Sequence, residues 1–180
     1  MSASPFKLNL HELPRRAGDF KDYRLDFATL ESIGNPMIAI PVKSPILITV
    51  RAESVSDGIL LSGTISGTAV GECGRCLDPI EKEIKQNFQE LFFYENRASE
   101  DVDEDQEFIM EGDIADLEIP IRDAVILALP INPLCSENCR GLCSGCGEKW
   151  ENLPGDHEHQ LIDPRWKGLS EWKSDPRFGR

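Results

Sequence analysis

Three features are missing from this sequence: long hydrophobic runs, an export signal and catalytic motifs. No stretch approaches the ~20 consecutive apolar residues of a membrane-spanning helix. The N-terminus lacks the basic, apolar and small-residue order of a secretory signal, so we expect a cytoplasmic protein that does not enter a membrane. There is no zinc-protease pattern, phosphate-binding glycine loop or nucleophile elbow. We therefore expect a protein that is not an enzyme and has no small-molecule substrate.

Charge is unevenly distributed along the 180 residues, which carry a net charge of −13. Residues 44–134 hold 19 acidic and 6 basic side chains, whereas residues 1–43 hold 5 and 6 and residues 135–180 hold 8 and 7. An acidic surface repels phosphate backbones and attracts basic partners. The pattern favours a basic protein partner, or RNA held only at the near-neutral ends. It is equally compatible with acids that simply keep the chain soluble.

The middle of the chain predicts antiparallel strands. Apolar and polar residues alternate over 46–53, Ser56-Asp57-Gly58 is a hairpin turn signal, and a returning strand runs over 59–72. Small residues gather on one face of that strand, which indicates that something packs closely against it. The apolar spacing over 80–94 fits either a helix or a strand, and we favour a strand because the hairpin pattern continues.

One helix is expected after an acidic loop. Residues 95–107 contain seven acids and one base, which predicts a solvated loop. Asp116 can cap a helix over 116–129 that ends before Pro130, and its nearly all-round apolar surface predicts burial. The fold class is thus α+β, with a curved antiparallel sheet packed on a buried helix. We predict a core domain over 1–134 and a cysteine-rich, zinc-binding-like module with a tail over 135–180.

Six cysteines carry the chemistry, and none is isolated. Two residues between cysteines allow both sulfurs to bind one zinc ion, and this spacing occurs twice. The residues are Cys73, Cys76, Cys135, Cys139, Cys143 and Cys146.

Several groupings of these cysteines are open. The last four could form one local site, or Cys73 and Cys76 could pair across the fold with Cys143 and Cys146 as in a zinc ribbon. Disulfides suit a secreted framework, of which there is no sign, and a redox pair would need to open a helix. We favour metal and take the local four-cysteine set as the first choice, with the set that includes Cys73 and Cys76 as the alternative.

Four thiolates would close the coordination of a zinc ion, which makes a structural site rather than a catalytic one. Downstream, His157 and His159 flank Glu158 and could substitute into such a site, because histidine is a common zinc ligand. A histidine pair on a polar loop is more often simply exposed, so their role stays open.

Several stretches together resemble the YceD family, the large ribosomal RNA subunit accumulation proteins. They are Leu13-Pro14-Arg15-Arg16-Ala17-Gly18, Glu72-Cys73-Gly74-Arg75-Cys76-Leu77-Asp78-Pro79, the run from Ala124 to Pro130, the run from Pro133 to Gly147 that contains four cysteines, and Asp163-Pro164-Arg165-Trp166. The resemblance covers most of the chain. It implies a role in the synthesis, processing or accumulation of large-subunit ribosomal RNA, and a genetic association with a large-subunit ribosomal protein.

The sequence therefore predicts a non-enzymatic factor in ribosome biogenesis. Its partner would be large-subunit ribosomal RNA or its precursor, or a basic large-subunit ribosomal protein. Candidate binding residues are Arg75, Arg140, Lys149, Arg165 and Lys167. The acidic middle would hold or shield a basic ribosomal protein. Two alternatives are a stand-alone zinc-ribbon nucleic-acid binder acting in transcription and a thiol oxidoreductase.

Overall fold

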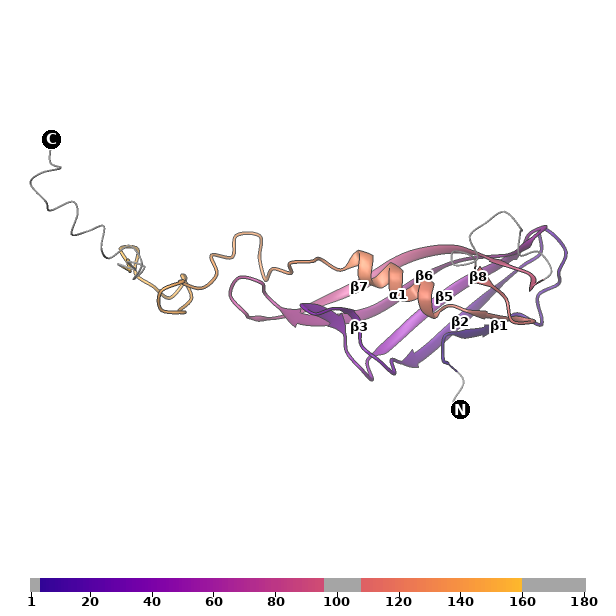
Figure 1. Ribbon diagram of the computed structural model, residues 1–180, viewed down its shortest axis with the longest axis horizontal. Helices are drawn as coiled ribbons and strands as arrows, with labels where there is room; N and C mark the ends of the chain where they lie inside the picture. The colour runs from indigo at the N-terminus through magenta and orange to yellow at the C-terminus, as the bar shows by residue number, and fades with distance from the viewer. Residues whose placement is uncertain (1–3, 96–107, 160–180) are drawn as a thin grey trace, which may run out of the picture.

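An open sheet of long antiparallel strands forms the body of the protein. The computed structural model describes residues 4–95 and 108–159 (Figure 1). Strands β5 (Pro45–Ser54), β6 (Gly58–Glu72) and β7 (Pro79–Phe93) follow one another as hairpins, and β2 (Phe20–Ala28) pairs with the free side of β5. Strands β6 and β7 pair along their entire length, from Gly58 opposite Phe93 to Glu72 opposite Pro79.

Short strands complete the sheet and cover one end of its inner face. The hairpin of β3 (Ile33–Asn35) and β4 (Ile38–Ile40) joins β6 beyond the end of β5. Strand β8 (Phe108–Ile109) adds a short parallel pairing to β7. Strands β1 (Lys7–Asn9) and β9 (Ile114–Asp116) form a separate two-stranded sheet.

The predicted α+β class and its hairpins are confirmed. The strand over 80–94 is strand β7, and the turn at Ser56-Asp57-Gly58 joins β5 to β6. The small residues of β6 do mark close packing: a Cβ on Gly63 would lie 2.4 Å from the carbonyl oxygen of Thr49 and 2.8 Å from the ring of Phe88. Residues 20–40, to which the sequence pattern assigns no element, form β2, β3 and β4. Edge strand β2 gives a weak pattern because it buries neither face fully.

Helix α1 (Glu118–Ala128) packs on the inner face of the sheet, against β7 and β3. Asp116 accepts a hydrogen bond from the backbone N–H of Glu118 at 3.0 Å, and the chain becomes extended at Leu129, before Pro130. The prediction of all-round burial is wrong. Ile121 is buried against the sheet but Leu127 is 85% exposed, because the sheet lies on one side of the helix only.

The core lies between the inner face of the sheet, α1 and the β1–β9 pair. Alternate residues of β5 and β6 point into it, as do the buried side chains of the helix. No helix in residues 4–95 and 108–159 is long and apolar enough to span a membrane. Of the predicted acidic loop, residues 96–107 lie outside the described parts of the chain, as does the tail from residue 160 onward.

Packing of α1 on the sheet predicts a large mutational cost at its buried face. Ile121→Ala removes a fully buried side chain and should lower the free energy of unfolding by about 3 kcal/mol. The matched control Leu127→Ala, on the exposed side, should change it by less than about 0.5 kcal/mol. Urea denaturation followed by circular dichroism measures both, and equal effects would contradict the packing described here.

Candidate metal centres

Both Cys-x-x-Cys pairs adopt the same turn, which we call a knuckle. In the first, the N–H of Cys73 donates to the carbonyl of Asp78 at 2.8 Å, and that of Leu77 donates to the carbonyl of Cys73 at 2.9 Å. In the second, Cys143 donates to Glu148 at 2.7 Å and Gly147 donates to Cys143 at 2.8 Å. The two hydrogen bonds bend the chain so that both sulfurs of each pair point to one side.

The residue after the second cysteine of each knuckle needs left-handed backbone geometry. Gly147 has a φ of 76° and adopts it freely, whereas Leu77 has a φ of 62°. A side chain in this region costs about 1–2 kcal/mol. The first knuckle therefore depends on support from its surroundings, which the paired β6 and β7 strands provide.

The first cluster combines the first knuckle with Cys135 and Cys139. The sulfurs of Cys73 and Cys139 are 3.8 Å apart, those of Cys76 and Cys135 are 3.5 Å apart, and all four lie within 4.8 Å of one another. Around a tetrahedral zinc ion with Zn–S bonds of about 2.3 Å, sulfurs lie roughly 3.8 Å apart. The four thiols therefore fit a zinc ion, and they would leave no coordination position open.

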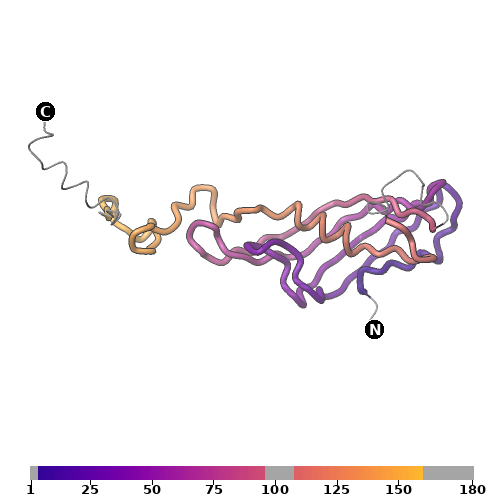
Figure 2. Tube along the Cα trace, in the orientation of Figure 1, coloured from indigo at the N-terminus to yellow at the C-terminus, as the bar shows by residue number. Residues whose placement is uncertain are grey.

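Backbone contacts hold the two halves of the first cluster together. The N–H of Gly74 donates to the carbonyl of Pro133 at 2.8 Å, and the guanidinium of Arg75 donates to the carbonyl of Cys139 at 2.8 Å. A Cβ on Gly74 would lie 1.8 Å from the side-chain oxygen of Asn132, so a larger residue here would displace the Asn132 side chain. Figure 2 shows the segment after the helix running past the β6–β7 hairpin turn, which brings these groups together.

The thiols of the first cluster perturb one another strongly. Burial raises the pKa of Cys73, but nearby backbone N–H groups, foremost that of Cys135, outweigh it and lower this pKa to about 6. The backbone N–H of Asp78 lowers the pKa of Cys76, yet burial and the neighbouring thiols raise it to about 11. Four adjacent thiolates repel one another, and a divalent cation removes that repulsion. The cluster thus has the electrostatics of a cation site.

The second cluster combines the second knuckle with two histidines. Both Cys143 and Cys146 place their sulfur 3.5 Å from Nε2 of His157, and the His159 ring lies 4.5 Å from that of His157 between centroids. The four ligand atoms lie within 4.8 Å of one another. A Cβ on Gly145 would lie 2.4 Å from the His159 ring, so glycine leaves the space that this imidazole occupies. Two thiols and two imidazoles are a common zinc ligand set.

The structure groups the cysteines in neither of the predicted ways. Cys135 and Cys139 face the first knuckle, not Cys143 and Cys146, and the first knuckle does not meet the second. Spacing does not decide this, because three residues separate Cys135 from Cys139 as well as Cys139 from Cys143. The hydrogen bonds of Gly74 to Pro133 and of Arg75 to Cys139 hold residues 133–139 against the first knuckle. Counting ligands would have indicated this division, since six cysteines and two histidines suffice for two tetrahedral sites.

The predicted binding residues are partly engaged within the protein. Arg75 donates a hydrogen bond to the backbone carbonyl of Cys139, and Lys149 forms an ion pair with Asp78 at 2.5 Å. The guanidinium of Arg140 lies 5.5 Å from the ring centroid of Trp150. Arg75 and Arg140 are exposed, whereas Lys149 is half-buried. Arg165 and Lys167 lie outside the described residues.

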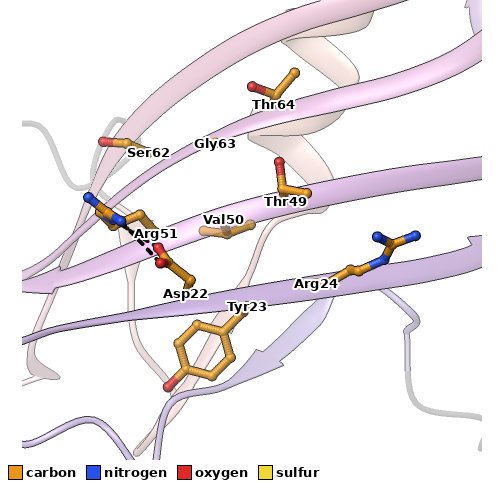
Figure 3. Close-up of a pocket in the computed structure, with 9 residues that line it drawn as sticks. All are labelled: Asp22, Tyr23, Arg24, Thr49, Val50, Arg51, Ser62, Gly63 and Thr64. Atoms are coloured by element: carbon orange, nitrogen blue, oxygen red, sulfur yellow. Dashed lines mark hydrogen bonds and ion pairs between the residues drawn. The ribbon is translucent and has the colours of Figure 1, made fainter.

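A shallow hollow also lies on the outer face of the sheet, over β2, β5 and β6 (Figure 3). Arg51 binds Asp22 there through two hydrogen bonds of 2.8 and 3.0 Å, and the remaining lining is mainly hydroxyl groups and backbone. Arg51 lowers the pKa of Asp22 and so keeps the carboxylate ionised. The lining of the hollow contains no cysteine or histidine, and its carboxylate is bound by Arg51, so the two cysteine clusters are the stronger candidates.

Comparison with known proteins shows that both clusters lie within a segment matched by a protein-family model. The family model described as "Large ribosomal RNA subunit accumulation protein YceD" matches residues 61–173, a range that includes both clusters. The chain belongs to the YceD family. No solved structure matches it.

Relatives of this YceD-family protein span bacteria and plants. An uncharacterised protein of Mycobacterium tuberculosis is 39% identical over 170 residues, covering 94% of this chain and 82% of that protein. The uncharacterised protein YlbN of Bacillus subtilis is 25% identical over 161 residues, 89% of this chain and 90% of YlbN. A chloroplastic protein of Zea mays named as a large ribosomal RNA subunit accumulation protein YCED homolog is 29% identical over 155 residues, 70% of this chain and 51% of that protein.

In the first cluster, Cys73 on the hairpin turn contacts Cys139, 66 residues away in sequence, so we predict that it helps to hold residues 130–142 in place. Cys73→Ser should leave the strand signal in circular dichroism unchanged and make residues 130–142 at least about tenfold more susceptible to limited proteolysis. Cys146→Ser, in the second cluster, is the matched control and should leave that segment protected. Equal protection in wild type and Cys73→Ser would show that the thiols do not join the two segments.

Proposed function

We propose that this protein supports the synthesis, processing or accumulation of large-subunit ribosomal RNA as a non-enzymatic binding factor in the cytoplasm. Membership of the YceD family is the observation that carries this proposal. The printed name of the Zea mays relative supports the same role. The metal clusters support binding rather than catalysis, because each offers four protein ligands and leaves no position for a substrate.

The direct partner is a basic protein of the large subunit. Glu72 at the end of β6 and Glu81 and Glu83 on β7 lie on the outer sheet face beside the first cluster, and we call these three the hairpin acids. All three are exposed and make no ion pair within the described residues. A cluster of unpaired carboxylates attracts a basic surface and speeds its association. Residues 100–107 add six acids to the chain, and this negative charge would favour the same kind of basic partner.

Zinc in the first cluster would be structural. Cys73, Cys76, Cys135 and Cys139 would hold it and fix the segment after α1 to the hairpin. The partner surface would then combine the hairpin acids with the module held beside them. A stand-alone zinc ribbon fits less well, because a fragment of residues 130–180 lacks both cysteines of the first knuckle.

RNA is the second candidate partner, and one feature favours it. Arg140 and Trp150 together offer a cation and an aromatic ring, the groups that stack on unpaired bases. Residues 160–180 add five basic and three acidic side chains, among them Arg165 and Lys167. Residues 135–159, however, contain five acids and only two bases, which opposes phosphate binding. The charge balance therefore favours the basic protein.

A pull-down tests this function. Tagged protein isolated gently from lysate should recover a basic large-subunit protein or large-subunit precursors, and recovery should survive ribonuclease. Loss of recovery after ribonuclease would make RNA the bridge. Recovery of RNA polymerase, or of nothing ribosomal, would contradict the assembly role.

Charge neutralisation tests the partner surface. A variant with Glu72→Gln, Glu81→Gln and Glu83→Gln should weaken recovery of the basic protein about tenfold at low salt, because three attractive charges are lost. The matched control changes three exposed acids elsewhere, Glu12, Asp26 and Glu31, to their amides and should bind as wild type. If both variants recovered equally less of the basic protein, net charge alone would explain the effect and the hairpin acids would not be the partner surface.

A further inference from the structure

We propose that Cys143, Cys146, His157 and His159 form a second, exchangeable zinc site, whose metal is gained and lost while the first cluster stays loaded. Occupancy of this site would fold residues 143–159 against the hairpin. The proposal concerns the metal chemistry of this chain and stands apart from the ribosomal role. It starts from differences between the two clusters in burial, in origin along the chain and in ligand type.

Burial differs between the clusters. In the first, Cys73, Cys76 and Cys139 are buried, and Cys73 is fully inaccessible. In the second, only Cys143 is buried, whereas Cys146 and His159 are exposed and His157 is half-buried. A chelator must reach the ion or one of its ligands to remove the metal. It can approach the second site through two exposed ligands, whereas the first offers only the exposed Cys135 beside three buried thiols. Removal of metal from the first site therefore requires more local unfolding.

The origin of the ligands along the chain also differs. The first cluster joins a hairpin turn to a segment after α1, and both are anchored by the sheet, the helix and the hydrogen bonds of Gly74 and Arg75. All four ligands of the second cluster come from residues 143–159, which contain no helix or long strand. Such a loop buries little apolar surface and needs the metal to remain folded.

The second site is connected to the body through a short chain of contacts. The ring of His157 meets Trp150 edge-on at 5.7 Å between centroids, and the N–H of Trp150 donates to the carbonyl of Gly141 at 3.1 Å. Next to it, Lys149 lies in a bridge with Leu142 and pairs with Asp78 on the hairpin. Metal at the second site therefore positions Trp150 and brings Lys149 to Asp78.

Zinc binding at this site needs no oxidant or reductant. Zn²⁺ gains two bonds from thiolate sulfur and two from imidazole nitrogen, the two thiol protons pass to solvent, and no oxidation state changes.

Zinc stoichiometry and exchange test the proposal on the full chain. Purified protein should contain two zinc ions by elemental analysis, and 4-(2-pyridylazo)resorcinol should remove one at least ten times faster than the other. His157→Ala with His159→Ala should contain one ion, the slow one. One ion in wild type, two ions in this variant, or equal rates of removal would overturn the proposal.

A glycine variant tests the same site without removing a ligand. Gly145→Ala should make the fast ion leave at least ten times faster still, because the added Cβ displaces the His159 ring, and should leave the slow ion unchanged. Ser144→Ala changes the neighbouring residue of the same knuckle and is the matched control with wild-type rates. An unchanged fast rate in Gly145→Ala would contradict the assignment of His159.

Tryptophan fluorescence reports the folding step. The chain has three tryptophans, so Trp166→Phe with Trp172→Phe leaves Trp150 as the single emitter. Its emission should shift to longer wavelength in step with loss of the fast ion, as the indole becomes exposed. A shift that follows the slow ion, or no shift at all, would show that the second site does not position Trp150.

Discussion

The uninterrupted pairing of β6 with β7 is the constraint on which the rest of the structure depends. The ladder runs from Gly58 to Glu72 against Pro79 to Phe93 and ends in a turn that contains the first knuckle. Because the strands are held on both sides of this turn, Leu77 can keep a φ of 62° that a free loop would relax. The two cysteines are thereby presented at a fixed place, and the chain after α1 is long enough to reach them.

The second constraint is electrostatic. The body is acidic, and the first cluster adds four thiols whose charged forms repel one another within 4.8 Å. Such a group is stable in two ways, as mostly protonated thiols or as thiolates around a cation. Arg75 and Lys149 offset part of the negative charge by contacting the Cys139 carbonyl and Asp78. Two of the predicted binding residues, Arg75 and Lys149, thus make contacts within the protein while staying at least partly exposed.

The two clusters have different roles in the structure. The first joins distant parts of the chain and therefore belongs to the fold, while the second organises a single loop. Family membership extends over both, since the matched range of 61–173 contains every ligand. Under the proposals above, the hairpin acids would hold a partner and the loop of residues 143–159 would fold with its metal.

The sequence by itself determined the local features of this protein. Alternation over 46–53, the Ser56-Asp57-Gly58 turn and Pro130 specified strands, hairpin and helix end, because these depend on neighbours a few residues apart. The two knuckles were equally visible as Cys-x-x-Cys pairs. The same sequence could not show that Leu127 is exposed, since a helix that is apolar all round does not reveal how many sides are covered.

Only the tertiary structure decided which ligands meet. Cys73 and Cys135 are far apart in sequence, and their pairing depends on where α1 crosses the sheet and where the chain emerges beside the hairpin. His157 and His159 complete the second cluster because residues 143–159 fold back on themselves, with the His157 ring edge-on to that of Trp150. Spacing fixes which residues can bind a metal, but the path of the chain fixes which of them share one.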